Sequence, residues 1–72
     1  MSQLTVELCP ETSICSLVKP EAKTDLMPHE VADIRAGGGD LERVRSVIAA
    51  ADAAFASGLD EAELKQIAAR LG

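Results

Sequence analysis

The stretch Leu4–Pro28, LTVELCPETSICSLVKPEAKTDLMP, decides the fold of this 72-residue chain. Its first run, residues 4–9, has an apolar side chain at every second position, which is the period of a half-buried β-strand. Residues 14–19 form a second β-type run, and residues 24–27 would be a short third strand. A segment that begins with Pro-Glu separates each pair of runs, and Pro is favoured at the second position of a type I turn. The stretch therefore predicts a three-stranded antiparallel meander.

Beyond this stretch, the apolar residues follow helical spacing. The first helix is expected over Pro28–Ala36, because Pro is favoured at the first helical position and the glycines at 37–39 end the helix. Asp40 is a suitable N-cap for a second helix that we expect to continue to Ser57. Its apolar face would consist of Leu41, Val44, Val47, Ile48, Ala51, Ala54 and Phe55.

A third helix is expected to begin after Asp60. Asp60 and Glu63 have the spacing of a capping box, in which each side chain accepts a hydrogen bond from the other residue's backbone N–H. Leu59 and Leu64 flank this motif as a hydrophobic staple. The predicted order is thus β-β-β-α-α-α, and the helices are the only cover for one face of the sheet. We expect one two-layer α+β domain over residues 1–72, with the meander in 1–27 and the helical part in 28–72.

Charge and composition argue against several classes of function. Twelve acidic residues outnumber seven basic ones, the net charge is −5, and neither half of the chain is basic, so no nucleic-acid footprint is visible. Phe55 is the only aromatic residue, which leaves no stacking platform for bases. The N-terminus lacks the pattern of a signal peptide, and no apolar run reaches the ~18 residues of a membrane span. We therefore expect a cytoplasmic protein that binds neither nucleic acid nor membrane.

Cys9 and Cys15, on either side of the first turn, are the residues most suited to metal binding or redox chemistry. A four-residue loop would point the two thiols to opposite faces of the hairpin, whereas a three- or five-residue loop would place them on one face. The apolar pattern leaves both registers open. The first gathers inside the fold Leu4, Val6, Leu8, Cys15 and Leu17. The second gathers Leu4, Val6, Leu8, Ile14 and Val18.

A shared face would allow a metal site. Cys9, Cys15 and His29 would then be ligands, with Asp25 or Glu30 as a fourth, and zinc accepts such a mixed set. The alternatives are that the cysteines are small buried hydrophobes or form a disulfide, and that His29 is a solvated residue at a helix start.

No catalytic constellation can be assembled from the sequence, and so short a chain has difficulty enclosing a pocket of ~300 Å³. We therefore expect no enzyme. The first hypothesis is a small acidic accessory protein that acts by docking to a protein partner. The alanine-rich stretch 49–56 would let another helix approach closely, so a homodimer is a second form of the same hypothesis. The alternative hypothesis is a thiol-based metal-binding or redox-sensing protein that uses Cys9 and Cys15.

Overall fold

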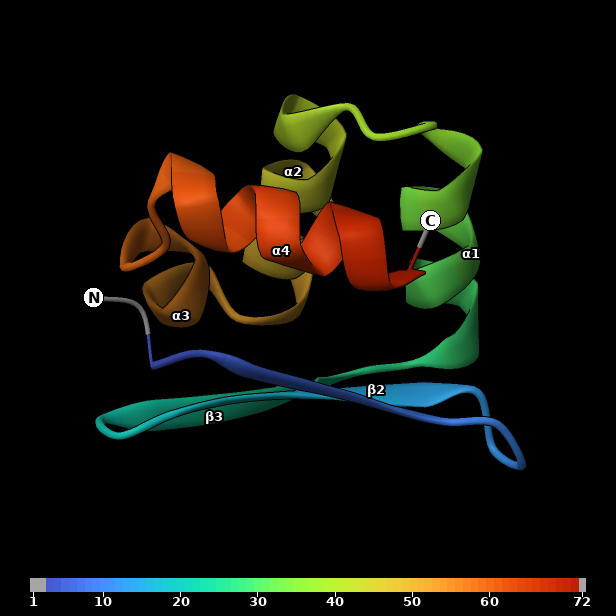
Figure 1. The fold of residues 1–72 in the computed structure, drawn as a ribbon, viewed down its shortest axis with the longest axis horizontal. Coiled ribbons are helices and arrows are strands. Elements are labelled where there is room, and N and C mark those ends of the chain that lie inside the picture. The colour runs from blue at the N-terminus through green and yellow to red at the C-terminus, as the bar shows by residue number, and fades with distance from the viewer. Residues whose placement is uncertain (1–2, 72) are drawn as a thin grey trace.

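The computed structural model describes residues 3–71 and confirms the α+β class, with a three-stranded antiparallel sheet followed by helices (Figure 1). The strands are β1 (Thr5–Cys9), β2 (Ile14–Lys19) and β3 (Ala22–Leu26). The helices are α1 (Pro28–Ala36), α2 (Leu41–Ala51), α3 (Ala53–Ser57) and α4 (Glu61–Leu71). None of the helices within residues 3–71 combines the length and the apolar character needed to cross a bilayer.

The sheet has the order β1-β2-β3, as the meander predicts. Cys9 lies opposite Ile14, so the first hairpin has a four-residue loop over residues 10–13. Ser13 takes a left-handed conformation there (φ 58°), and its N–H donates to the carbonyl of Cys9 at 2.8 Å. The third strand begins two residues before the predicted position, because Lys19 pairs directly with Ala22 and leaves only two residues in the second turn.

All helices lie on one side of the sheet, in a second layer above it (Figure 1). The sheet contributes alternate side chains to the core between the layers, and the helices contribute their apolar stripes. The fully enclosed side chains of that core are Leu17, Leu26, Ile48, Ile67, Leu71, Val31, Val44 and Cys15. No element of residues 3–71 covers the opposite face of the sheet, which displays the remaining side chains of the strands.

The prediction of a single helix from residue 41 to 57 is wrong, and residues 3–71 contain four helices instead of three. The helix breaks at Asp52, where the backbone is extended (φ −157°, ψ 95°) and the side chain accepts a hydrogen bond from the N–H of Phe55 at 3.1 Å. Asp competes in this way with the backbone bonds of a helix interior. The break turns Phe55 and Ala56 into the core, while Ala54, predicted on the apolar face, is exposed.

The capping box at the start of the last helix is confirmed. The N–H of Glu63 donates to the carboxylate of Asp60 at 2.8 Å, and the N–H of Asp60 donates to the carboxylate of Glu63 at 3.0 Å. Leu59 and Leu64 are both buried beside it, as expected of a hydrophobic staple. Lys65 and Glu61 form the i,i+4 ion pair on the outer face of α4.

Candidate functional site

The hairpin register separates the two cysteines. Cys15 pairs with Leu8 and is completely buried in the core, whereas Cys9 lies opposite Ile14 and is exposed. Hydrogen bonds from the side chain and backbone of Thr12 lower the pKa of the Cys9 thiol. Burial raises the pKa of the Cys15 thiol. Because adjacent positions of a strand pair alternate between faces, the thiols point to opposite sides of the sheet and both remain unpaired.

The predicted metal-ligand set is therefore not brought together. His29 is exposed in the first turn of α1, while Cys15 is enclosed between the sheet and the helices. Within residues 3–71, no group of three or more His, Cys, Asp or Glu side chains is arranged to hold a metal ion. The zinc site that the sequence allowed for Cys9, Cys15 and His29 depended on a shared face, which this register does not provide.

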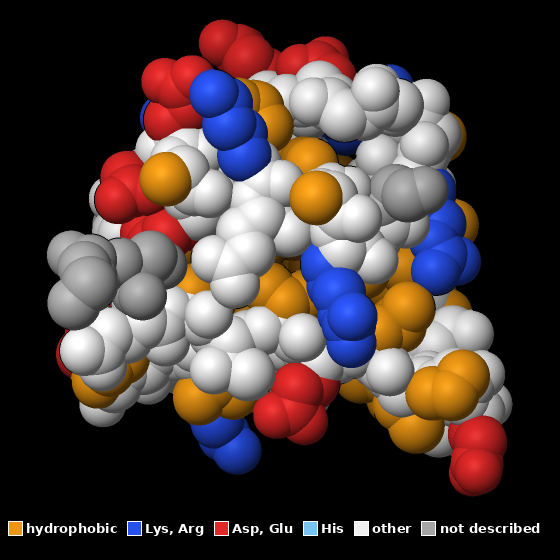
Figure 2. All heavy atoms as spheres, in the orientation of Figure 1, with side chains coloured by type: hydrophobic (Ala, Val, Ile, Leu, Met, Phe, Trp, Pro, Cys, Tyr) orange, Lys and Arg blue, Asp and Glu red, His pale blue; other side chains and the backbone are white. Residues whose placement is uncertain are grey.

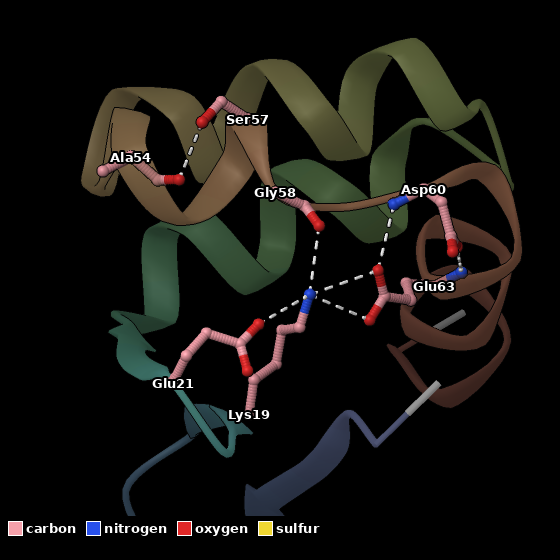
Figure 3. Close-up of polar contacts among 7 residues, drawn as sticks. All are labelled: Lys19, Glu21, Ala54, Ser57, Gly58, Asp60 and Glu63. Atoms are coloured by element: carbon pink, nitrogen blue, oxygen red, sulfur yellow. Dashed lines mark hydrogen bonds and ion pairs between the residues drawn. The ribbon is translucent and has the colours of Figure 1, made fainter. Parts of the chain in front are cut away.

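A charged cluster joins the end of β2 to the connection between α3 and α4 (Figure 3). The ammonium group of Lys19 lies 3.2 Å from the carboxylate of Glu63, 3.3 Å from that of Glu21 and 3.0 Å from the carbonyl oxygen of Gly58. The Glu63 side chain is only 4% exposed, and its hydrogen bond raises the pKa of Lys19. Since Lys19 bonds to both carboxylates and to the carbonyl oxygen of Gly58, and Glu63 also caps α4, the cluster anchors the second hairpin to the helices.

The outer edge of β1 is the second notable feature. β1 ends the strand order, so only β2 pairs with it. The Leu4 carbonyl accepts a hydrogen bond from the side-chain amide of Gln66 on α4 at 3.0 Å, and it is therefore directed away from β2. Backbone groups alternate in direction along an antiparallel strand, so the N–H and C=O groups of Val6 and Leu8 are directed to the same outer side. They offer a template for a further strand.

A shallow groove of about 550 Å³ runs along this edge, between β1 and α4. It is lined by Leu4, Thr5, Val6, Gln66, Ala69 and Arg70. Figure 2 shows hydrophobic side chains at the surface between the sheet layer and the helix layer on this side of the molecule. Arg70 is exposed, and within residues 3–71 its guanidinium forms no hydrogen bond or ion pair. The groove thus combines outward backbone groups, apolar surface and one cation.

A second hollow of about 450 Å³ lies between α2 and α4. It is lined by Leu41, Glu42, Arg45, Ser46, Glu61 and Leu64. Its walls are the N-terminal parts of two helices, where the N–H of Glu42 is already capped by the carboxylate of Asp40 at 3.0 Å. Within residues 3–71, the hollow includes no strand edge, whereas the groove beside β1 offers the outward N–H and C=O groups of Val6 and Leu8.

The sequence did not reveal the groove. It indicated that β1 lies at an edge, because a meander leaves its first and third strands with one neighbour each. It gave no sign that Gln66, Ala69 and Arg70 lie beside that edge, since Gln66 is 62 positions from the residue it contacts. The only available signal was negative: helical spacing predicts a buried stripe of Leu64, Ile67, Ala68 and Leu71 in the last helix, and these three residues fall outside it.

Comparisons of the chain with known protein families, with curated proteins and with solved structures found no significant match. The geometry of the β1 edge and its groove is therefore the basis for a functional proposal.

Proposed function

We propose that this protein is a small accessory protein that acts by docking and not by catalysis, and that its protein partner adds a strand to the outer edge of β1. The observation that carries the proposal is the outward direction of the Val6 and Leu8 backbone groups beside the groove lined by α4. Strand addition to an exposed sheet edge is a common mode of peptide recognition, in which the main chain provides affinity and side-chain pockets provide specificity. We expect a cytoplasmic setting, in which Cys9 and Cys15 stay reduced.

The composition of β1 supports this use of its edge. Proteins commonly protect an edge strand with Pro, with a bulge or with charged side chains, Lys above all. β1 pairs with β2 in an unbroken register, and Glu7 is its one charged residue, on the open face. β3, the opposite edge, has Lys23 and Asp25 among its five residues. Of the two edges, β1 is therefore the better template.

The free energy of backbone hydrogen bonds at the β1 edge is too small to hold a partner without contacts from side chains. The N–H and C=O groups of Val6 and Leu8 allow up to four ladder bonds, each worth about 1 kcal/mol net. Association costs at least about 4 kcal/mol of lost rigid-body freedom, which offsets this gain. The sheet edge therefore provides direction, and contacts in the groove must provide most of the affinity.

Site-specific cross-linking in the producing cells tests the proposal. A photoreactive residue at Ala69, in the groove, should give one discrete cross-linked partner, and the same residue at Ala53 is the control, since that alanine is also exposed but lies on α3. The partner, once identified and added to the purified protein, should slow hydrogen exchange of the Val6 and Leu8 amides. Equal cross-linking from both positions, none from Ala69, or unchanged exchange at β1 would contradict docking at this edge.

A further inference from the structure

We infer, on the basis of the docking function proposed above, that the added strand belongs to a different protein and carries an acidic and a basic residue next to each other. The acidic side chain faces α4 and pairs with Arg70. The basic side chain faces the open side of the sheet and pairs with Glu7. Two charges on β1 and α4 that are unmatched within residues 3–71 thus select the partner.

The acidic residue of the added strand follows from the groove that lies beside β1. A strand that pairs with β1 directs every second side chain into the groove, opposite Val6 or Leu8. The exposed guanidinium of Arg70 lines the same groove, and the neighbouring Ala69 is too small to fill it. A carboxylate is the group that a guanidinium fork binds best, through two parallel hydrogen bonds. An acidic side chain in the groove therefore gains a charge-assisted contact at Arg70.

The basic residue of the added strand follows from the open face of the sheet, which no helix of residues 3–71 covers. The strand register aligns Glu7, Ser16 and Asp25 in one row across β1, β2 and β3. The Ser16 hydroxyl donates to Asp25 at 2.9 Å, while Glu7 has no such partner within residues 3–71. An added strand extends this row by one residue beside Glu7. A Lys or Arg there forms a favourable cross-strand pair, whereas an acid adds a like charge to the row.

The two charged residues of the partner are adjacent in its sequence, because side chains of a strand alternate between faces. A second copy of this chain does not supply them. Its β1 would direct Leu4, Val6 and Leu8 into the groove and Thr5, Glu7 and Cys9 to the open side. That set contains no carboxylate for Arg70 and no cation for Glu7, and each copy carries a net charge of −5. The charges at this edge therefore disfavour self-pairing.

Two capped peptides of identical composition test the inference. In TVKDTVT, the valines and the aspartate share the groove-facing side and the lysine is on the other side; in TVDKTVT, the two charges are exchanged. Titration into isotope-labelled protein, followed by the amide shifts of residues 4–9, should give about tenfold tighter binding of TVKDTVT. Arg70→Gln should leave only the part of the preference that Glu7 provides, and Arg70→Glu should remove the preference, because the groove then favours the lysine while Glu7 still favours the lysine on the open side. Arg45→Glu, at an exposed arginine on α2, should leave it unchanged.

The outcomes separate the inference from the docking function. Equal binding of both peptides at residues 4–9 would overturn the charge assignment and leave strand addition standing. No shift at these residues with either peptide at millimolar concentration would contradict strand addition as well. A dimer of the protein alone in sedimentation, with residues 4–9 protected at its interface, would overturn the choice of a different protein in favour of a second copy.

Discussion

Replacing Asp52 with Ala probes the break that divides α2 from α3. The carboxylate of Asp52 accepts the N–H of Phe55 at 3.1 Å and so caps α3. The sequence pattern placed Asp52 in a helix interior, where its replacement by Ala would be harmless or favourable. The structure predicts the opposite, because the change removes the cap of α3 and allows α2 to continue through residue 52.

The magnitude follows from the lost cap. Loss of an N-cap side chain costs about 1 kcal/mol. The free energy of unfolding should therefore fall by about 1 kcal/mol, which lowers the melting temperature of a domain of this size by about 4–8 °C.

Thermal and urea denaturation, followed by circular dichroism, measure this change. Asp52→Asn is the matched control, since Asn keeps a side-chain oxygen that can cap α3 and should remain close to the wild type. Asp60→Ala, which removes one bond of the capping box before α4, should cost a similar amount. A melting temperature of Asp52→Ala equal to that of Asp52→Asn would refute the capping role of Asp52.

Three further predictions concern the core, the thiols and the charged cluster. Phe55→Ala should lower the free energy of unfolding by about 3–5 kcal/mol in urea titration, because the ring is only 4% exposed; a loss below about 1 kcal/mol would contradict its place in the core. A thiol reagent should label Cys9 in the native protein and Cys15 only on unfolding, because hydrogen bonds from Thr12 lower the pKa of Cys9 and burial raises that of Cys15; equal rates would be inconsistent with the register. The raised pKa of Lys19 stabilises the fold below the ordinary lysine value of 10.5 and loses this effect as the pH rises through the raised value. Alkaline unfolding should accordingly depend less on pH in Lys19→Met, and an unchanged profile would count against the ion pair with Glu63.

Local patterns in the sequence account for much of this fold. The alternating apolar residues and the Pro-Glu turns identify the three strands, and the meander follows because the short connections allow only antiparallel neighbours. Pro28 and the glycines after Ala36 set the bounds of α1, and Asp60 with Glu63 sets the start of α4. In each case the deciding contacts lie within a few residues, so the local sequence contains the whole interaction.

Other features were decided by contacts between distant parts of the chain. The two hairpin registers bury similar apolar sets locally, and packing beneath the helices selects the one that places Cys15, rather than Ile14, in the core. The alanine-rich segment favours a continuous helix, but burial of Phe55 and the cap at Asp52 break it. The groove beside β1 arises in the same way.

That groove exists only when α4 lies along a strand from the opposite end of the chain, as the contact between Gln66 and Leu4 shows. Strand alternation predicted from the sequence which side chains of β1 face the helices. Which residues of α4 they meet depends on how the two layers pack, and packing is governed by the combined shape and burial of the whole core. For this reason the first two strands, the bounds of α1 and the cap of α4 could be predicted from the sequence, while the proposed docking edge and its unmatched Arg70 required the tertiary structure.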